Sequence, residues 1–198
     1  MRSHCVIYLL LSLVGCLEPL RAISQTFAPF ALPAVSGKVV NLRDFQSKRA
    51  VVLIFVSNHC IYAQKYHDRI QNYVREYEDK GIQFVLINSN DPNQSIQDNF
   101  SHCQIHVSRK SIHLPYLLDS LNQAAKLLGV TKNPECIITI WKSGVYKILY
   151  RGMIDNDPLH VHKVREEYLK KALENVLSGA ADTLPYTKPL GCDIRWRE

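Results

Sequence analysis

The sequence predicts an α/β fold of three layers, in which helices cover both faces of a mixed central sheet. Two observations support this prediction. Apolar segments of strand length alternate with segments of helical periodicity, and the last two apolar segments are joined by a short turn. Alternating strands and helices favour parallel strands, and a closing hairpin adds antiparallel ones. A chain of 198 residues, 46% hydrophobic and 21% charged, is long enough for one such domain with terminal extensions.

The first half of the domain contains a predicted hairpin, two strands and a helix. Short apolar stretches within residues 27–45 flank a Ser-Gly-Lys turn, which is typical of a β-hairpin. The largely apolar runs 51–56 and 82–87 indicate buried strands. Between them, apolar residues at spacings of three and four predict a helix over 62–80, and Gly81 ends it.

The signals in the middle of the chain are weaker. Residues 93–112 are polar, with a weak helical pattern and little to bury, and a short strand over 115–118 and a short helix over 122–128 follow. The apolar runs 136–141 and 145–150, joined by a Lys-Ser-Gly turn, then predict a second hairpin.

The chain ends in a predicted helix and a tail. A helix is expected over 159–177, with Val161, Val164 and Tyr168 on its apolar face, because these residues follow a helical spacing. Residues 180–198 contain two prolines and predict an extended tail.

Residues 1–22 predict an export signal, which would place the protein in the periplasm or cell envelope. Arg2 supplies a positive charge, and residues 5–14 form an apolar stretch that is too short to span a bilayer comfortably. The folded domain would then comprise residues 23–179, followed by the tail over 180–198.

The sequence allows two cleavage sites, and an uncleaved membrane anchor is a third alternative. Leu13-Val14-Gly15-Cys16 resembles the lipobox of bacterial lipoproteins, in which the cysteine is lipidated and becomes the first mature residue. Ala22 instead suits ordinary signal peptidase cleavage. We favour the lipobox because all four positions fit. Cys16 is therefore a predicted lipidation site that would attach the protein to a membrane.

Cys60 is the leading candidate for chemistry. It follows the strand 51–56 and a short polar step, and the predicted helix begins directly after it. The unpaired N–H groups and the positive dipole end at a helix N-terminus favour the thiolate, which lowers a cysteine pKa below its free value of about 8.5. This placement predicts a reactive thiol, and the alternative is an inert cysteine in a retained scaffold. The adjacent His59 is either a charge partner or a surface histidine.

The cysteines expected in the exported domain are Cys60, Cys103, Cys136 and Cys192. An oxidising compartment permits three complete pairings among them. Cys192 is the best candidate for a resolving thiol, because a flexible tail could bring it to Cys60 and a sulfenic acid needs a second thiol to become a disulfide. It could instead be a structural cysteine that pins the tail. Cys103 is a second candidate, whereas Cys136 opens an apolar strand and is expected to be buried and inert.

Charge and motif content argue against several classes of function. The net charge of +6 is spread along the chain without a run of like charges, so we predict no nucleic-acid partner. Neither G-x-G-x-x-G nor a P-loop is present, so no organic cofactor is expected. The histidines that could join Cys60 in a copper or zinc site are His102, His106, His113, His160 and His162. The close cysteine pairs typical of such sites are absent, and we predict no metal.

Several short motifs occur in a fixed order along the chain. They are Asn58–Tyr62, Ile87–Pro92, Pro115–Asp119, Pro134-Glu135, Tyr150–Gly152 and Thr187–Cys192. Together they resemble the thioredoxin-like superfamily, specifically its redoxin or alkyl-hydroperoxide-reductase/thiol-specific-antioxidant group, and a bacterial subfamily with an Asn-His-Cys-Pro-Tyr motif. The resemblance covers about residues 27–178. It implies a thioredoxin-like three-layer α/β/α sandwich with a mixed central sheet and an N-terminal β-hairpin.

The sequence departs from the resembled families at several site positions. Ala63 stands where a thioredoxin would have its second cysteine, so dithiol exchange cannot be confined to this motif. A peroxiredoxin would have proline and threonine where this chain has Leu53 and Ser57. Ser57 can supply the hydroxyl, but the proline is missing. A cysteine that is frequent in the subfamily is replaced by Lys132.

The resemblance also implies roles for two further residues. Pro134 would follow a cis peptide bond and pack beside the sulfur of Cys60. Arg151 would approach Cys60 and stabilise a thiolate or a peroxide oxygen, unless it is a surface arginine at a strand end.

These observations predict an exported thiol-dependent oxidoreductase of thioredoxin or peroxiredoxin type. Cys60 would attack a peroxide or a protein disulfide, and Cys192 or an external thiol reductant would resolve the product. The alternative is a catalytically weak binding module of the cell envelope, for a protein partner or a metal. The alanine at position 63 keeps this alternative open.

Overall fold

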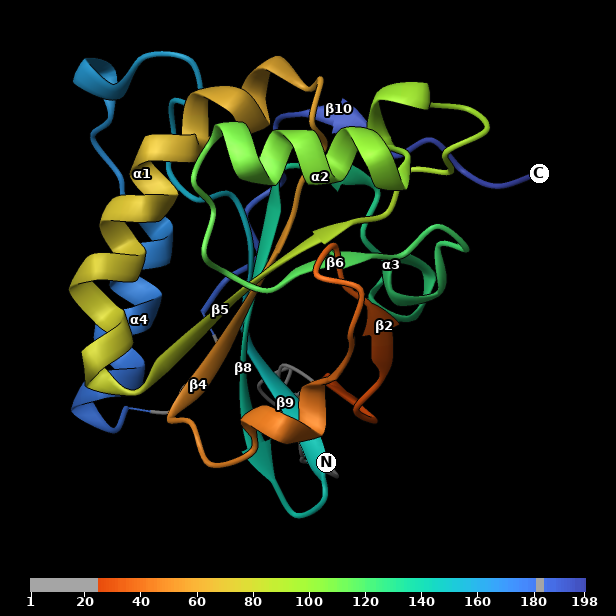
Figure 1. The fold of residues 1–198 in the computed structure, drawn as a ribbon. Helices are drawn as coiled ribbons and strands as arrows, with labels where there is room; N and C mark the ends of the chain where they lie inside the picture. The colour runs from red at the N-terminus through yellow and green to blue at the C-terminus, as the bar shows by residue number, and fades with distance from the viewer. Residues whose placement is uncertain (1–24, 181–183) are drawn as a thin grey trace, which may run out of the picture.

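The computed structural model describes residues 25–180 and 184–198 and contains a mixed sheet of six strands (Figure 1). The strands lie in the order β1-β9-β8-β4-β5-β6. The strands β4, β5 and β6 run parallel to one another, whereas β8 and β9 run antiparallel to their neighbours. The predicted sandwich with a mixed sheet is therefore confirmed.

The elements have the following bounds. The sheet strands are β1 (Thr26–Phe27), β4 (Ala50–Phe55), β5 (Ile82–Asn88), β6 (Tyr116–Leu118), β8 (Glu135–Lys142) and β9 (Val145–Gly152). Two smaller sheets consist of β2 (Ala31–Pro33) with β3 (Val39–Asn41), and of β7 (Lys132–Asn133) with β10 (Cys192–Asp193). The α-helices are α1 (Ile61–Tyr77), α2 (Phe100–Arg109), α3 (Gln123–Leu128) and α4 (Tyr168–Ser178).

The central strand β4 explains why the fold has three layers. All of its side chains are buried, because alternate residues enter opposite cores. Val52 and Ile54 pack with residues of α1 and α4, whereas Val51, Leu53 and Phe55 pack with residues of α3 and the N-terminal hairpin. Helices α1 and α4 lie side by side on one face of the sheet, and α3 lies on the other side (Figure 1).

The predicted helix over 159–177 is wrong in its first half. Helix α4 begins only at Tyr168, and Val161 lies in a short 3-10 turn with 64% of its surface exposed. The Asn156 side chain accepts hydrogen bonds from the backbone N–H groups of Arg165 and Glu166. The Asn156 side chain thus binds two backbone N–H groups that would otherwise donate within a longer helix.

The polar stretch 93–112 is better ordered than its composition suggests. It contains a 3-10 turn over Ile96–Asp98 and then α2, which Asn99 caps by accepting from the His102 backbone N–H at 2.9 Å. The expectation of little to bury is wrong here, because Cys103 and Ile112 belong to the core beneath α1.

The described part of the tail, 184–198, is extended as predicted, but it is anchored along its length. Its first residues pair with the outer edge of β9, where the Leu184 N–H donates to the Leu149 carbonyl at 2.8 Å. Further on, β10 pairs with β7, and Ile194 is buried with 2% exposure. The expected flexible tail is therefore replaced by a docked one, because backbone pairing and an apolar anchor hold it.

The predicted signal over residues 1–22 and the lipidation site Cys16 lie outside the described residues. Within the described ranges, no helix is long and apolar enough to cross a membrane.

Candidate functional site

Cys60 is the N-cap residue of α1, at the point where the chain leaves the sheet. Its backbone is extended, with φ −72° and ψ 117°, and its carbonyl accepts a hydrogen bond from the Gln64 N–H at 2.9 Å. No acidic residue occupies the first turn of α1. The positive end of the helix dipole at Cys60 is therefore not neutralised by a neighbouring acidic side chain, and Cys60 itself is buried, with 1% exposure.

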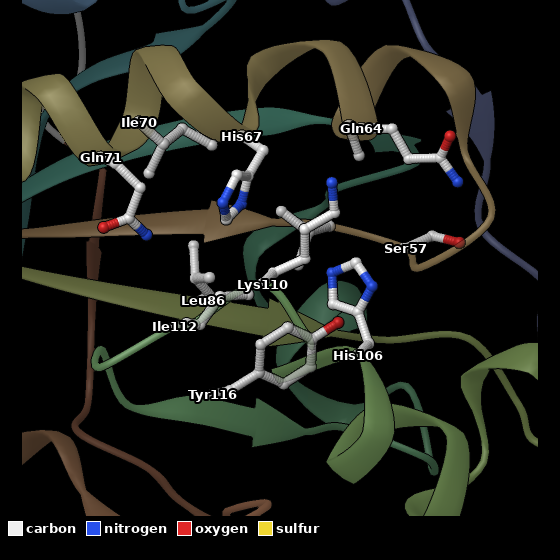
Figure 2. A pocket seen from close by; sticks show the side chains of 12 residues that line it. Ser57, Gln64, His67, Ile70, Gln71, Leu86, His106, Lys110, Ile112 and Tyr116 are labelled. Carbon is white, nitrogen blue, oxygen red and sulfur yellow. The ribbon is translucent and has the colours of Figure 1, made fainter. Parts of the chain in front are cut away.

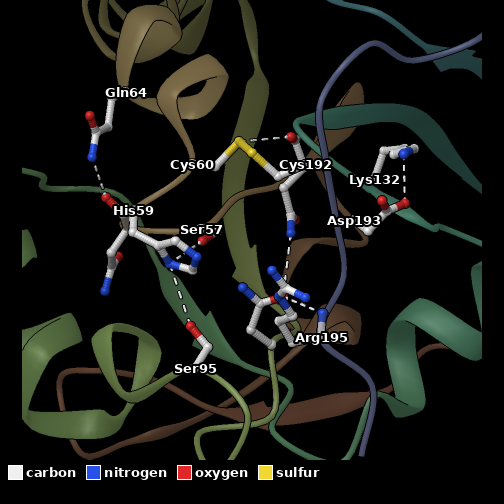
Figure 3. The surroundings of a disulfide bond; sticks show 12 residues. Ser57, His59, Cys60, Gln64, Ser95, Lys132, Cys192, Asp193 and Arg195 are labelled. Carbon is white, nitrogen blue, oxygen red and sulfur yellow. Dashed lines mark hydrogen bonds and ion pairs between the residues drawn. A yellow bond between two sulfur atoms is a disulfide. The ribbon is translucent and has the colours of Figure 1, made fainter.

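Cys60 and Cys192 form a disulfide between residues that are 132 positions apart in the sequence (Figure 3). Their Cα atoms are 6.0 Å apart. Cys60 Sγ also lies 3.1 Å from the carbonyl oxygen of Asn133, and the Asn133–Pro134 peptide bond is cis. The structure thus brings together three of the predicted residues, Cys60, Cys192 and Pro134, around one disulfide.

The pairing of β10 with β7 brings Cys192 to this position. Cys192 is opposite Asn133, and Asp193 is opposite Lys132, with which it forms an ion pair at 2.5 Å. A Cβ atom on Gly191 would meet the Asn133 carbonyl oxygen at 2.1 Å, so the close approach of the tail requires glycine. The second sulfur is therefore positioned by backbone contacts that the disulfide itself does not supply.

A buried carboxylate, Asp98, organises the loop that precedes Cys60. Only 3% of Asp98 is exposed. Its carboxylate accepts hydrogen bonds from the loop that precedes Cys60, from the C-terminal end of β5 and the residues after it, and from its own turn. The partners of Oδ1 are the Asn58 backbone N–H at 2.8 Å and Asn88 Nδ2 at 2.7 Å. The partners of Oδ2 are Asn90 Nδ2 at 2.7 Å, Ser95 Oγ at 2.7 Å, Ser57 Oγ at 3.0 Å and His59 Nδ1 at 3.0 Å. A carboxylate with this many donors is fixed in place.

Burial alone would raise the pKa of Asp98, but the hydrogen bonds outweigh it. Donation from Asn90, Ser95 and Asn88, and from the Asn58 backbone, holds the pKa of this carboxyl below its usual range. Asp98 is a site residue that the sequence reasoning missed. The Ile87–Pro92 motif was a partial signal, since it supplies two of the donors.

Ser57 and His59 are both directed to this carboxylate. Ser57 Oγ donates to Asp98 and lies 3.1 Å from His59 Nδ1, and that nitrogen lies 3.0 Å from Asp98 Oδ2. In the described part of the chain, no hydrogen bond joins either side chain to the sulfur of Cys60. A direct role for Ser57 or His59 at the sulfur stays a prediction.

Arg151 lies in β9 and pairs with Glu135, at 2.5 Å between Nε and Oε1. Its two terminal nitrogens donate to the carbonyls of Leu128 and Gly129, at the C-terminal end of α3. Burial raises the pKa of Glu135, and the Arg151 charge opposes this rise. Among the described residues, the guanidinium thus donates to Glu135 and to two carbonyls at the C-terminal end of α3, and its predicted approach to Cys60 stays a prediction.

The two remaining cysteines of the described chain are free and buried. Burial raises the pKa of Cys103 to about 11 and that of Cys136 well above its ordinary value. A thiol with a raised pKa is mostly protonated and is a poor nucleophile at neutral pH. The raised pKa makes Cys103 a weaker nucleophile, and its role as a second resolving candidate stays a prediction. The burial of Cys136 agrees with its predicted position in an apolar strand.

The histidines of the metal hypothesis are dispersed. His160 pairs with Asp157 and has the His162 ring 5.9 Å away, whereas His106 lies on α2 near Tyr116. Across residues 25–180 and 184–198, no group of three or more His, Cys, Asp or Glu side chains is arranged to hold a metal ion.

The fold and the site together define a class: a thioredoxin-fold protein with a disulfide at the N-terminus of its first long helix. The chain belongs to the AhpC/TSA family, whose model matches residues 23–154. The predicted resemblance to the redoxin group is thereby confirmed. No curated protein sequence gives a significant match to the chain.

Solved structures from several bacteria are similar to this chain. A hypothetical protein from Sinorhizobium meliloti 1021 is 25% identical, with a TM-score of 0.78, over 88% of this chain and 94% of that one. An uncharacterized conserved protein from Geobacillus kaustophilus is 30% identical, with a TM-score of 0.77, over 88% and 92%. A putative thiol:disulfide interchange protein DsbE from Chlorobium tepidum shares the fold at 22% identity, with a TM-score of 0.57, over 80% and 96%.

Proposed function

We propose that the protein is a thiol–disulfide oxidoreductase that cycles between a Cys60/Cys192 dithiol and the Cys60–Cys192 disulfide. The observation that carries this proposal is the disulfide between the N-cap of α1 and the docked tail. The missing second cysteine at Ala63 is then replaced by a cysteine that arrives from the other end of the chain. Family membership and the fold of the interchange protein support the same chemistry.

The reductive reaction has two steps. The Cys60 thiolate attacks one sulfur of a substrate disulfide, forms a mixed disulfide and releases the first substrate thiolate. The Cys192 thiolate then attacks Cys60 Sγ, releases the second substrate thiolate and leaves the protein disulfide. Two electrons pass from the protein to the substrate, and an external thiol reductant restores the dithiol. The docked tail gives the geometry of the product of this step, with the two Cα atoms 6.0 Å apart and Cys60 1% exposed, so the substrate disulfide must displace the tail to reach Cys60 in the first step.

Peroxide reduction is a second candidate, and family membership favours it. A hydroperoxide would oxidise the Cys60 thiolate to a sulfenic acid and leave as an alcohol, and the Cys192 thiol would displace water to form the disulfide. The surroundings of the sulfur favour disulfide exchange over this route. The nearest polar partner of Cys60 Sγ is the Asn133 carbonyl, an acceptor, and the donors of Ser57 and Arg151 are engaged elsewhere.

The test is turnover of a protein disulfide and of a hydroperoxide with a dithiol reductant, for the wild type and three variants. Cys60→Ser should lower turnover at least about 100-fold, because it removes the nucleophile. Cys192→Ser should accumulate a mixed disulfide at Cys60, detectable by mass spectrometry, because no second thiol releases it. Cys136→Ala is the control and should retain turnover, since its thiol is free and buried and takes no part in the disulfide.

The outcomes separate the candidates. Turnover of the protein disulfide alone assigns exchange, and turnover of the hydroperoxide alone assigns the peroxidase route. Activity on neither substrate, or activity that Cys60→Ser leaves unchanged, rules out catalysis at Cys60 and favours the binding module.

The proposed setting is the cell envelope, after export directed by residues 1–22. The apolar stretch near the N-terminus supports export, and a disulfide-forming cysteine pair suits an oxidising compartment. Membrane attachment through lipidated Cys16 is part of this proposal. The mass of the mature N-terminal peptide distinguishes lipidation at Cys16 from cleavage near Ala22.

A further inference from the structure

The last residues of the tail lie in a polar cradle beyond the disulfide, formed by Asn90, Asp91 and Asn122. The Arg195 backbone N–H donates to Asn90 Oδ1 at 2.9 Å, and the Arg195 carbonyl accepts from the Asp91 N–H at 2.8 Å (Figure 3). The Arg197 N–H donates to Asn122 Oδ1 at 2.7 Å. The cradle therefore holds the tail at the third and the fifth residue after the second cysteine of the disulfide.

The two asparagine side chains of the cradle are fixed by contacts that do not involve the tail. Both are buried. Asn90 Nδ2 donates to the Asp98 carboxylate at 2.7 Å, and Asn122 Nδ2 donates to the Ser89 carbonyl. Because the amide nitrogens are engaged in this way, the amide oxygens are turned toward the tail as acceptors. The cradle is thus preorganised for an extended segment, even when the tail is absent from it.

The cradle contacts the backbone of the tail and leaves its side chains free. The side chains of Arg195, Trp196 and Arg197 are all exposed. The hydrogen bonds to Asn90, Asp91 and Asn122 use backbone N–H and carbonyl groups, which every residue except proline supplies in full. Recognition of this kind selects an extended backbone and tolerates different side chains.

The cradle must change its occupant when a substrate reaches Cys60. Cys60 is bonded to Cys192, and β10 pairs with β7 beside it. A substrate cysteine that forms a mixed disulfide with Cys60 takes the position of Cys192, so residues 191–193 must leave β7. The residues that follow the substrate cysteine then approach the cradle from the direction in which the tail approaches it now.

A cavity between α1 and α2 offers no alternative site for a substrate segment, although Ser57 and Gln64 in its lining are close to Cys60 in sequence (Figure 2). Its volume is about 30 Å³, which is too small for a polypeptide. Ser57 Oγ already donates to Asp98, and Gln64 Nε2 donates to the Asn58 carbonyl. This cavity therefore lacks both the room and the free donors that the cradle provides.

We propose that the cradle binds the segment that follows the cysteine of a substrate disulfide, in place of the tail. The inference rests on the proposed function and names the substrate class, an extended protein segment with at least five residues after its cysteine. Glutathione has a single residue after its cysteine, so it cannot reach Asn90 or Asn122. Protein disulfides should therefore be better substrates than small disulfides.

The test measures mixed-disulfide equilibria of the full chain with Cys192→Ser, in which a mixed disulfide at Cys60 is not resolved. Two amidated peptides compete with glutathione for Cys60. Gly-Cys-Asp-Ile-Arg-Trp-Arg copies residues 191–197, and Gly-Cys-Asp-Ile ends before the cradle. Mass spectrometry of the intact protein gives each equilibrium constant relative to glutathione. We expect the longer peptide to be favoured at least about tenfold, because only this peptide can form the backbone hydrogen bonds of the cradle.

Two further peptides separate backbone from side-chain recognition. Methyl groups on the backbone nitrogens of the fifth and seventh residues remove the donors that correspond to Arg195 and Arg197, and should abolish most of the preference. Gly-Cys-Asp-Ile-Ser-Ala-Ser keeps these donors and should keep most of the preference. In the protein, Asn122→Gly removes one acceptor at a position with φ 56°, which glycine adopts without strain, and should lower the preference at least about threefold. Asn72→Ala, at an exposed asparagine of α1, is the matched control.

The outcomes distinguish this inference from the proposed function. Equal equilibrium constants for the longer and the shorter peptide would overturn the inference and leave exchange at Cys60 intact. A preference that survives methylation, or that is lost when only the side chains change, would also overturn it. If no peptide forms a mixed disulfide with Cys60, the proposed function fails and the inference fails with it.

Discussion

The two sulfurs of the Cys60–Cys192 disulfide are held by regions of different construction. Cys60 follows a loop whose polar groups converge on the buried carboxylate of Asp98. Cys192 lies on a tail that is held by backbone pairing with β7, by the close contact of Gly191 with Asn133 and by the burial of Ile194. Hydrogen bonds to a buried charge fix one sulfur, whereas hydrogen bonds of the tail backbone, steric fit and apolar burial fix the other.

This difference indicates which changes destabilise the region around each of the two cysteines. A network centred on an ionised carboxylate depends on the protonation state of that carboxylate, so it responds to pH. A strand that is docked by backbone hydrogen bonds and a buried isoleucine contains no buried charge, so it responds to changes of shape. Substitutions on the two sides should therefore separate into a pH-sensitive and a pH-insensitive class.

The largest effect is expected for Asp98→Ala. The substitution leaves buried donors from Asn88, Asn90 and the Asn58 backbone without an acceptor, and each such donor costs about 1–3 kcal/mol. We expect the free energy of unfolding to fall by about 3 kcal/mol or more, measured by urea denaturation of the oxidised protein. Asp68→Ala, an exposed carboxylate on α1, is the control and should stay within about 0.5 kcal/mol. Similar losses in both variants would contradict a special role for Asp98.

The next effect is expected for Gly191→Ala on the other side of the disulfide. The new Cβ would overlap the Asn133 carbonyl, so β10 must move away from β7. We expect a stability loss of about 1–3 kcal/mol, as for other overpacked sites, and at least about tenfold slower formation of the disulfide by oxidised glutathione.

Gly37→Ala gives a matched control for this substitution. Gly37 has φ +81° but nothing within 4 Å of its would-be Cβ, so alanine there meets backbone strain alone. It should cost about 1 kcal/mol of stability and leave the rate of disulfide formation unchanged. If both variants slowed the disulfide equally, the tail would not be positioned by the Gly191 contact.

The comparison also shows which parts of the molecule could be predicted from the sequence. The apolar run of β4 and the helix after Cys60 follow from local pattern. The sequence named Cys192 as the best candidate partner of Cys60 but left other pairings open, and the disulfide agrees with that candidate. Asp98 could not be found in this way, since its donors come from three separate segments that meet only in the folded chain. Likewise, the docking of the tail depends on a glycine contact with a residue far away in sequence.

A smaller effect is expected from acid. The pKa of Asp98 is depressed in the folded state, so its contribution to stability is fully present above the unfolded value near 3.8 and is lost as the pH falls through the lower folded value. The wild type should therefore lose stability below about pH 4 more steeply than Asp98→Asn, which cannot titrate. Urea midpoints at pH 7, 5, 4 and 3 give the two slopes, and parallel curves would show that another group carries the acid response.

The smallest effect is expected for Lys132→Ala, which removes the ion pair with Asp193 beside the disulfide. The Asp193 side chain is 74% exposed, so water screens the pair and its net contribution is about 0–1 kcal/mol. We expect a change in unfolding free energy below about 0.5 kcal/mol and no change in the rate of disulfide formation. A double-mutant cycle with Asp193→Ala measures the coupling directly. A coupling energy above about 1 kcal/mol, or one that decreases strongly with salt, would mean that charge also holds the tail, and the two sides of the disulfide would then no longer differ in kind.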